Sequence, residues 1–284
     1  MMLVNLVSLR PPVPFGGGKK GARSVVTEAF YDLDDVYDMN FIDFFGGSGL
    51  LSQWALEAGF REVVYNDFDD YLGRIRYFNS PRHIEYINWL RWYFYEANGL
   101  EPTSRVPDEL AEPVRRRVLE EFAKCEEDGL DPSVYEYPIL RPVAHQMRPY
   151  DSDPRQNRNC IVYTAARVAK SKPEKDNWCA GAKVESTDYR ELLRKYPITE
   201  NTVCSIDPPY PDTESFAYTG AVTLNDIGSL VEECLDKKAK VMVYGNKGSG
   251  IYNLMMTKFP TLKVCEFRLA TFNKDPFDYL YRNF

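Results

Sequence analysis

The sequence predicts an α/β fold with a parallel sheet at its core. Residues 39–67 contain an apolar strand, a glycine cluster, a helix and a second strand, which together form a βαβ pattern. Short strands alternate with helices again from about residue 180, and the stretch between these two parts is helical and then loop-rich. We therefore expect one domain formed by residues 1–75 and 180–284, and a mostly helical insert formed by residues 76–179.

The composition is that of a globular protein without a membrane span or a metal site. The chain has 284 residues, a formal net charge of −7, six cysteines and two histidines. No apolar run approaches the roughly 20 residues that cross a bilayer, and the start "MMLVNLVSLRPP" lacks the features of a secretory signal. We expect a cytoplasmic protein with reduced thiols and no metal, because its cysteines and histidines fit no standard zinc spacing.

The first βαβ unit carries a glycine turn suited to an anionic group. The apolar strand around Phe41 runs into Asp43 and then into F-x-G-x-G, formed by Phe45, Gly47 and Gly49. Glycines let the backbone take positive φ values and approach a ligand closely. The helix that follows presents free N–H groups at its start, which favour a phosphate or a carboxylate. A plain tight turn remains the alternative.

An acidic cluster follows the second strand of this unit. Asp67 lies about twenty residues after the glycine turn, where an acid can accept hydrogen bonds from both hydroxyls of a ribose. Asp69 and Asp70 lie close enough to take the same role, so the assignment among the three stays open.

The insert combines aromatic helices with a basic loop-rich part. Residues 71–125 have helical spacing, and we expect Trp89, Trp92 and Tyr93 to belong to the insert's own small core. Residues 148–175 carry scattered arginines and lysines that can contact a phosphate backbone despite the acidic total charge. The candidates are Arg155, Arg158, Arg167 and Lys170.

The stretch "TVCSIDPPY" is the most specific signal in the chain. An apolar strand ends at Asp207, which is followed by Pro208, Pro209 and Tyr210. The carboxyl ends of parallel strands are where α/β proteins bind ligands. The prolines stiffen the backbone, the carboxylate and the carbonyl of Pro208 accept hydrogen bonds, and the tyrosine offers a flat face. Together they suit a planar base with an exocyclic amine, such as a flipped adenine or cytosine.

The remaining elements complete the sheet. "AKVEST" predicts a strand that ends at Asp188, "LNDIGSLVEECLDKK" a helix, and "AKVMVYGN" a further strand. "LKVCEFRLAT" and "PFDYLYRNF" predict a closing pair of strands.

"DPPY" together with "FIDFFGGSG" resembles the amino-group DNA methyltransferases that use S-adenosylmethionine, most closely the Dam-type (alpha-group) enzymes that methylate adenine N6. "PPVPFGGGKKGAR" resembles the N-terminal lysine motif of that group, "YNDFDDYLGRIRYF" its segment after the second strand, and "FDYLYRNF" its closing strand. The resemblance covers a little over half of the chain. It departs from the group at Phe44, where proline is frequent, and in the insert, which lacks the usual recognition hairpin sequence.

The resemblance implies a Rossmann-like methyltransferase sheet with a closing antiparallel hairpin, and direct in-line transfer to adenine N6 in double-stranded DNA. The implied catalytic residues are Asp207, Pro208, Pro209 and Tyr210. The implied residues for S-adenosylmethionine are Lys19, Asp43, Phe45, Gly47, Gly49, Asp67 and Asp188. Asp188 also suits a helix N-cap. The insert then becomes the target-recognition part, and the four basic residues become DNA contacts in a bacterial or phage-infected cell.

Three other functions stay open from the sequence. The amine could belong to adenine in RNA or to cytosine N4, or the chain could be a non-catalytic DNA-binding relative. Methylation of cytosine at C5 does not fit this sequence. That reaction needs a Pro-Cys nucleophile, and no cysteine here follows a proline.

Overall fold

The computed structural model describes residues 6, 9–13, 19–101, 106–140, 142–143, 177–209, 222–268 and 277–284. The chain divides into two compact units, Met1–Asp69 with Asn177–Phe284, and Asp70–Asp176. The first division falls just before helix α3 (Tyr71–Phe78), whereas the boundary expected after residue 75 lies inside this helix.

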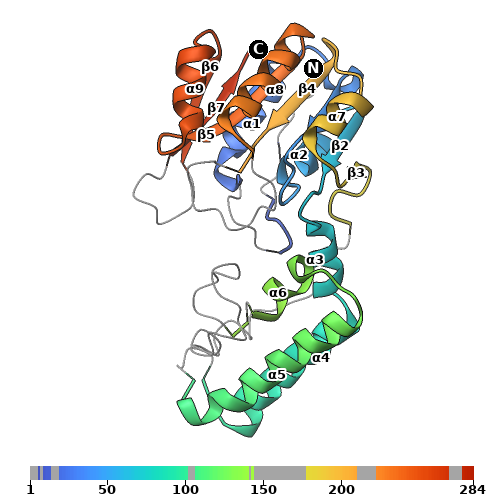
Figure 1. The fold of residues 1–284 in the computed structure, drawn as a ribbon, viewed down its shortest axis with the longest axis vertical. Helices are drawn as coiled ribbons and strands as arrows, with labels where there is room; N and C mark the ends of the chain where they lie inside the picture. The colour runs from blue at the N-terminus through green and yellow to red at the C-terminus, as the bar shows by residue number, and fades with distance from the viewer. Residues whose placement is uncertain are drawn as a thin grey trace. The chain divides into compact units, whose positions relative to one another are not determined.

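The larger unit is built on one mixed sheet of seven strands, counted over the described residues (Figure 1). Their order is β3-β2-β1-β4-β5-β7-β6. The strands are β1 Asn40–Asp43, β2 Glu62–Asn66, β3 Lys183–Glu185, β4 Thr202–Ile206, β5 Lys240–Asn246, β6 Lys263–Arg268 and β7 Phe277–Arg282. Strands β1 to β5 pair in parallel, whereas β7 is antiparallel to both β5 and β6. The predicted Rossmann-like sheet with a closing antiparallel hairpin is confirmed.

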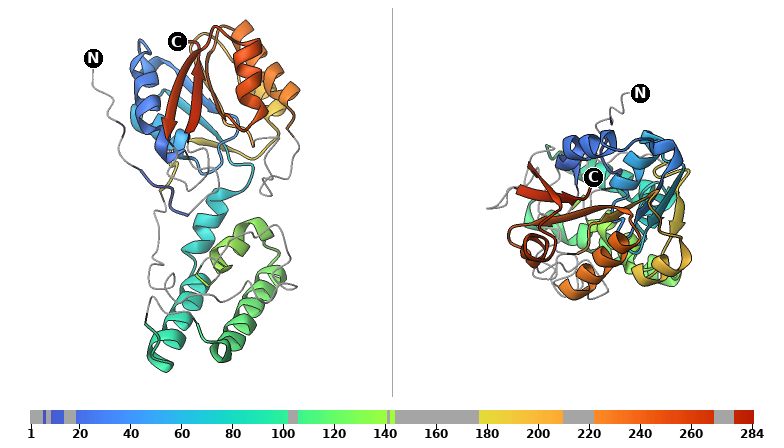
Figure 2. Two further views of the ribbon diagram at one scale, coloured as in Figure 1. Left: turned by 90° about the vertical axis from the view of Figure 1, so that its left-hand side faces the viewer. Right: turned by 90° about the horizontal axis from the view of Figure 1, so that it is seen from above.

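Helices cover both faces of this sheet, as the view from above shows (Figure 2). Side chains alternate between the two faces of a strand, so each central strand contributes side chains to a hydrophobic core on each face of the sheet. Ile42 and Cys204 pack with helices α7, α8 and α9, while Phe41 on the other face contacts Phe30 of α1 at 6.0 Å between ring centroids. The helices are α1 Arg23–Tyr31, α2 Leu50–Ala58, α7 Tyr189–Lys195, α8 Leu224–Asp236 and α9 Gly250–Lys258.

Helix α8 shows how the sequence sets one of these elements. Thr223 is its N-cap, and Thr223 and Asp226 form a reciprocal capping box that satisfies the first backbone N–H groups. Ile227, Leu230 and Val231 recur at helical spacing and are buried against the sheet.

The smaller unit is helical in the part that the structure describes. It contains α3, α4 Pro81–Arg91, a π-helix at Trp92–Ala97, α5 Asp108–Glu127 and α6 Pro132–Leu140. Tyr86, Phe94 and Phe122 belong to its core, and Trp89 and Tyr93 stack at 5.1 Å between centroids and pack against that core. Trp92 was also expected in this core, but half of its side chain is exposed. The predicted helical character of the insert is confirmed.

No helix among the described residues is long and apolar enough to cross a membrane.

Strand β7 is tied to its neighbours by side chains at its end. Asn283 accepts from the backbone N–H of Val241 at 2.8 Å and donates to the carbonyl of Ala239 at 2.9 Å, which extends the pairing beyond β7. Arg282 is fully buried and its guanidinium donates to Asp32 and Glu28 of α1, at 2.6 and 3.1 Å. The last strand is thereby joined to both β5 and α1.

We expect Asn283→Ala to lower the free energy of unfolding by about 1 kcal/mol, because two backbone groups of β5 lose their partners and water replaces them only in part. Urea denaturation measures this change. Asn283→Asp is the matched control, since it keeps the acceptor for Val241 and should lose about half as much. An unchanged transition in Asn283→Ala would contradict the anchoring role.

Candidate active site

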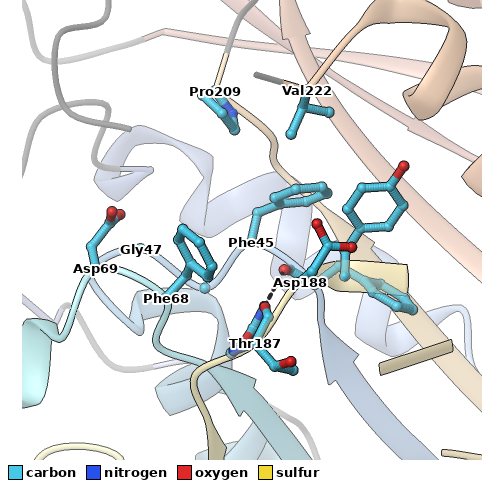
Figure 3. A pocket seen from close by; sticks show the side chains of 12 residues that line it. Phe45, Gly47, Phe68, Asp69, Thr187, Asp188, Pro209 and Val222 are labelled. Carbon is cyan, nitrogen blue, oxygen red and sulfur yellow. Dashed lines mark hydrogen bonds between the residues drawn. The ribbon is translucent and has the colours of Figure 1, made fainter. Parts of the chain in front are cut away.

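A pocket opens at the carboxyl edge of the parallel strands, where the loops after β1, β2 and β4 meet (Figure 3). Parallel pairing brings these strand ends to the same side of the sheet. The pocket lies wholly within the larger unit. It is lined by Phe44, Phe45, Gly46, Gly47, Asn66, Phe68, Asp69, Thr187, Asp188, Tyr189, Pro209 and Val222.

The glycine turn between β1 and α2 forms one wall. Gly47 and Gly49 have φ values of 49° and 68°, which other residues rarely adopt. A Cβ on Gly46 would lie 2.3 Å from the Tyr65 ring, so only glycine fits there. The Tyr65 hydroxyl donates to the carbonyl of Gly47 at 2.8 Å. The turn is thus held closely against β2, with Gly46 and Gly47 facing the pocket.

A second set of contacts fixes this turn from residues far along the chain. The indole N–H of Trp178 donates to the carbonyl of Ser48 at 2.8 Å, and the thiol of Cys179 to that of Gly49 at 3.3 Å. The backbone N–H of Cys179 also donates to Gln53 in α2 at 2.8 Å. These contacts were not predictable from local sequence patterns, because more than 120 residues separate the partners.

Asn66, at the end of β2, joins the loops after β1 and β3. Its side-chain amide donates to the carbonyls of Phe44 and Thr187, at 3.0 and 2.9 Å, and its oxygen accepts from the backbone N–H of Thr187 at 3.1 Å. The loops after β1 and β3 are therefore held at a fixed spacing. Sequence reasoning did not identify this residue.

The acids after β2 differ in their surroundings. The carboxylate of Asp67 is buried and lies 3.1 Å from the Tyr65 hydroxyl, whereas Asp69 lines the pocket. Phe68 between them also lines the pocket and is 46% exposed. Figure 3 shows Phe45, Phe68, Pro209 and Val222 among the residues that line the pocket. Phe68, which the sequence analysis did not single out, adds a flat apolar surface.

Asp188 both caps a helix and lines the pocket. Its carboxylate accepts from the backbone N–H of Arg190 at 2.9 Å and so caps helix α7. The same side chain lines the pocket and pairs with the Arg190 guanidinium at 3.1 Å. Arg190 also binds Asp226 at 2.7 Å, which fixes its position relative to α8.

Asp207 lies just after β4 in contact with Lys19. The ammonium of Lys19 is 2.8 Å from Asp207 Oδ1 and 3.7 Å from Asp278 Oδ2. Burial raises the pKa of Asp207, and the neighbouring Lys19 opposes this shift. Pro208 is buried and Pro209 lines the pocket. Lys19, expected near the cofactor, is thus brought to the predicted catalytic acid.

Asp43 lies beneath the site instead of lining the pocket. It is completely buried, and its Oδ2 accepts from the Ser52 hydroxyl at 2.8 Å. Burial, and secondarily the charge of Asp207, raise the pKa of Asp43 to about 7, although Ser52 and Ser205 oppose the shift. Asp43 and Ser205 are also paired in register between β1 and β4.

Several predicted site residues lie outside the described residues. They are Tyr210, Arg155, Arg158, Arg167 and Lys170. Within the described part of the chain, no group of three or more His, Cys, Asp or Glu side chains could hold a metal ion.

The raised pKa of Asp43 predicts a pH-dependent stability. The folded protein holds this proton up to about pH 7, whereas an unfolded chain releases it near pH 4. The contribution of Asp43 to the free energy of unfolding should therefore fall as the pH rises between these values, by up to about 4 kcal/mol. We expect Asp43→Asn to remove this part of the pH dependence in urea denaturation at several pH values. The same slope in both proteins would show that Asp43 does not titrate in this range.

No protein-family model matches the chain. A protein of Haemophilus influenzae named "Putative methyltransferase" is 26% identical to the chain over 187 residues. The match covers 63% of this chain and 56% of that protein, so the chain spans little more than half the length of this curated relative.

Among solved structures, the rRNA methyltransferase AviRa from Streptomyces viridochromogenes aligns with 98% of this chain and 88% of its own, at 14% identity and a TM-score of 0.36. That TM-score is too low to bear on the fold or the substrate. The chain is therefore similar in sequence to a protein named as a methyltransferase.

Proposed function

We propose that this protein transfers a methyl group from S-adenosylmethionine to the N6 amino group of adenine in double-stranded DNA. One observation carries the proposal. The Asp207-Pro208-Pro209 segment ends β4 directly beside the pocket formed by the glycine turn, and Pro209 lines that pocket. An acceptor for a base amine and a cavity for a nucleoside cofactor are therefore adjacent. The similarity to a protein named as a methyltransferase supports the same reaction class.

The residues present fit this cofactor. Phe45 and Phe68 offer flat faces to an adenine ring, and Asp188 can accept from its amine. Gly46 and Gly47 line the pocket without side chains, so the cofactor can approach the backbone of the turn. When bound, S-adenosylmethionine supplies an electrophilic methyl group on a cationic sulfur.

We assign the ribose to Asp67. Its carboxylate lies 3.1 Å from the Tyr65 hydroxyl, which is also 2.8 Å from the carbonyl of Gly47, so Asp67 lies next to the glycine turn. Asp69 is the alternative, because it already lines the pocket.

The chain's own groups would act on the target amine. The lone pair of an adenine amine is delocalised into the ring, which makes it a poor nucleophile. Hydrogen bonds from the amine to Asp207 and to the Pro208 carbonyl would favour a more tetrahedral, more nucleophilic nitrogen. Tyr210 would stack on the base. In this scheme the catalysis rests on positioning and electrostatics, without a covalent enzyme intermediate.

A base must leave the duplex stack to reach this acceptor. We propose that Arg155, Arg158, Arg167 and Lys170 of the insert contact the flanking DNA, because basic side chains release counterions from the phosphate backbone.

The reaction is tested by following tritiated methyl groups from S-adenosylmethionine into duplex DNA, single-stranded RNA and duplex RNA. We expect N6-methyladenine in DNA, identified by mass spectrometry of the digested product. N6-methyladenine in RNA alone, or N4-methylcytosine, would replace the proposed substrate. If no nucleic acid in this set is methylated, the proposal is overturned.

We expect Asp207→Asn to lower the rate of methyl transfer by roughly 10²–10³-fold, which is the usual effect of losing one electrostatic partner of a transition state. The affinity for S-adenosylmethionine, measured by calorimetry, should change less than about twofold, because the cofactor pocket does not include this carboxylate. Wild-type turnover in this variant would remove Asp207 from the mechanism.

The ribose assignment predicts a difference between two neighbouring acids. Asp67→Asn should weaken cofactor binding by roughly 10- to 100-fold, as expected for a lost charge-assisted hydrogen bond. Asp69→Asn is the matched control and should change the dissociation constant less than about threefold. The reverse ranking in calorimetry would assign the ribose to Asp69.

A further inference from the structure

Two charged side chains from distant parts of the sequence, Lys19 and Asp278, meet beside the proposed catalytic acid Asp207. Lys19 lies 2.8 Å from Asp207 and 3.7 Å from Asp278, and only 6% of Lys19 and 1% of Asp278 are exposed. Asp278 begins the closing strand β7 opposite Asn246, the last residue of β5. Because β7 is antiparallel to β5, its start lies at the edge where β4 and β5 end. The topology therefore places Asp278 at the active-site edge.

The charges in this cluster do not balance in pairs. One ammonium lies between two carboxylates, and the completely buried Asp43 contributes a further acid close to Asp207. Lys19 also lies over the ring of Tyr244 on β5, 5.9 Å from its centroid, and that ring face favours the cation. The groups that set the local charge are thus Asp43, Asp207, Asp278, Lys19 and the ring of Tyr244.

Lys19 affects the two oxygens of Asp207 differently. Asp207 Oδ1 is buried and is the oxygen nearest to Lys19, while the Asp207 side chain as a whole remains 15% exposed. The accessible part of the carboxylate can face a target amine while Oδ1 faces the ammonium. A cation held too closely would withdraw charge from the group that must attract the amine. A second carboxylate, that of Asp278 at 3.7 Å from the ammonium, limits this effect.

We propose that Asp278 is a positioning residue of the methyl-transfer site, which holds Lys19 between two carboxylates and thereby sets how much negative charge Asp207 presents to the target amine. This role rests on the proposed function. Burying an acid in a strand costs free energy, and buried ion pairs are frequently no more stable than apolar side chains of similar size. Stability alone therefore does not account for an aspartate at this place in β7.

The test compares Asp278→Asn, Lys19→Met and the double variant, with Glu266→Gln as control. Glu266 lies on the same hairpin, where it accepts from the Tyr279 hydroxyl at 2.9 Å outside the cluster. Its replacement removes a carboxylate without touching Lys19. Methyl transfer to DNA is measured as a function of pH, together with cofactor affinity and the melting temperature.

In Asp278→Asn we expect kcat to fall by about tenfold and the acid limb of its pH profile to move to lower pH, because Asp207 loses a neighbouring negative charge. In Lys19→Met the acid limb should move to higher pH, because burial raises the pKa of Asp207 and the opposing lysine is gone. Adding Asp278→Asn to Lys19→Met should raise kcat near neutral pH. Asp278→Glu, which keeps the charge, should recover part of the activity, and Glu266→Gln should behave as wild type.

A purely structural Asp278 would give a different result. Asp278→Asn would then have a lower melting temperature, while kcat per folded molecule and the pH profile stayed unchanged. Its effect on activity would also have the same sign with and without Lys19. Either of these outcomes overturns the proposal.

A measurement without turnover separates this proposal from the proposed function. A neighbouring carboxylate favours the protonated amine, which acetic anhydride does not modify. Mass spectrometry should therefore find Lys19 acetylated several times faster in Asp278→Asn than in wild type, relative to Lys258. Equal rates would overturn the contact. Faster labelling in a protein that methylates no nucleic acid would establish the contact, but it would overturn both the proposed function and the positioning role of Asp278.

Discussion

Parallel pairing of β1 with both β2 and β4 is the constraint on which the site depends. It aligns Asp43 with Tyr65 on one side and with Ser205 on the other. The chain must then leave all three strands at the same edge. The glycine turn and the Asp207 segment become neighbours for this reason, although about 160 residues lie between them. A shift of one residue in either pairing would turn every side chain to the other face.

The local patterns were sufficient to predict the sheet. Short apolar runs identified the strands, glycines marked the turn after β1, and the Asp-Pro-Pro run marked the end of β4. The contacts that hold these parts together were not predictable, because they join residues distant in sequence. Trp178 shows no periodic or motif signal, yet its indole holds the glycine turn. The sequence around Asp278 predicts only a strand, and its place at the active-site edge follows from the pairing of β7 with β5.

The site also shows how burial changes the meaning of a motif residue. Asp43 belongs to the glycine motif in sequence, but the fold buries it outside the pocket. Desolvation there raises its pKa and makes it a weaker acid. Lys19 belongs to the N-terminal motif, but its charge is shared with residues at the other end of the described chain. Sequence proximity to a motif therefore does not predict contact with a ligand, and the chemistry of each group follows from its neighbours.

The position of β7 between β5 and β6 has a consequence for biosynthesis. A ribosome makes β6 before β7, so a nascent chain that has formed β1 to β5 still lacks the strand that joins β6 to the sheet. Until residues 277–284 emerge from the exit tunnel, the edge of β5 has no partner from the hairpin, and Lys19 lacks one of its two carboxylates. Exposed strand edges attract other chains. The edge of β5 is therefore open to wrong pairing until β7 has been synthesised.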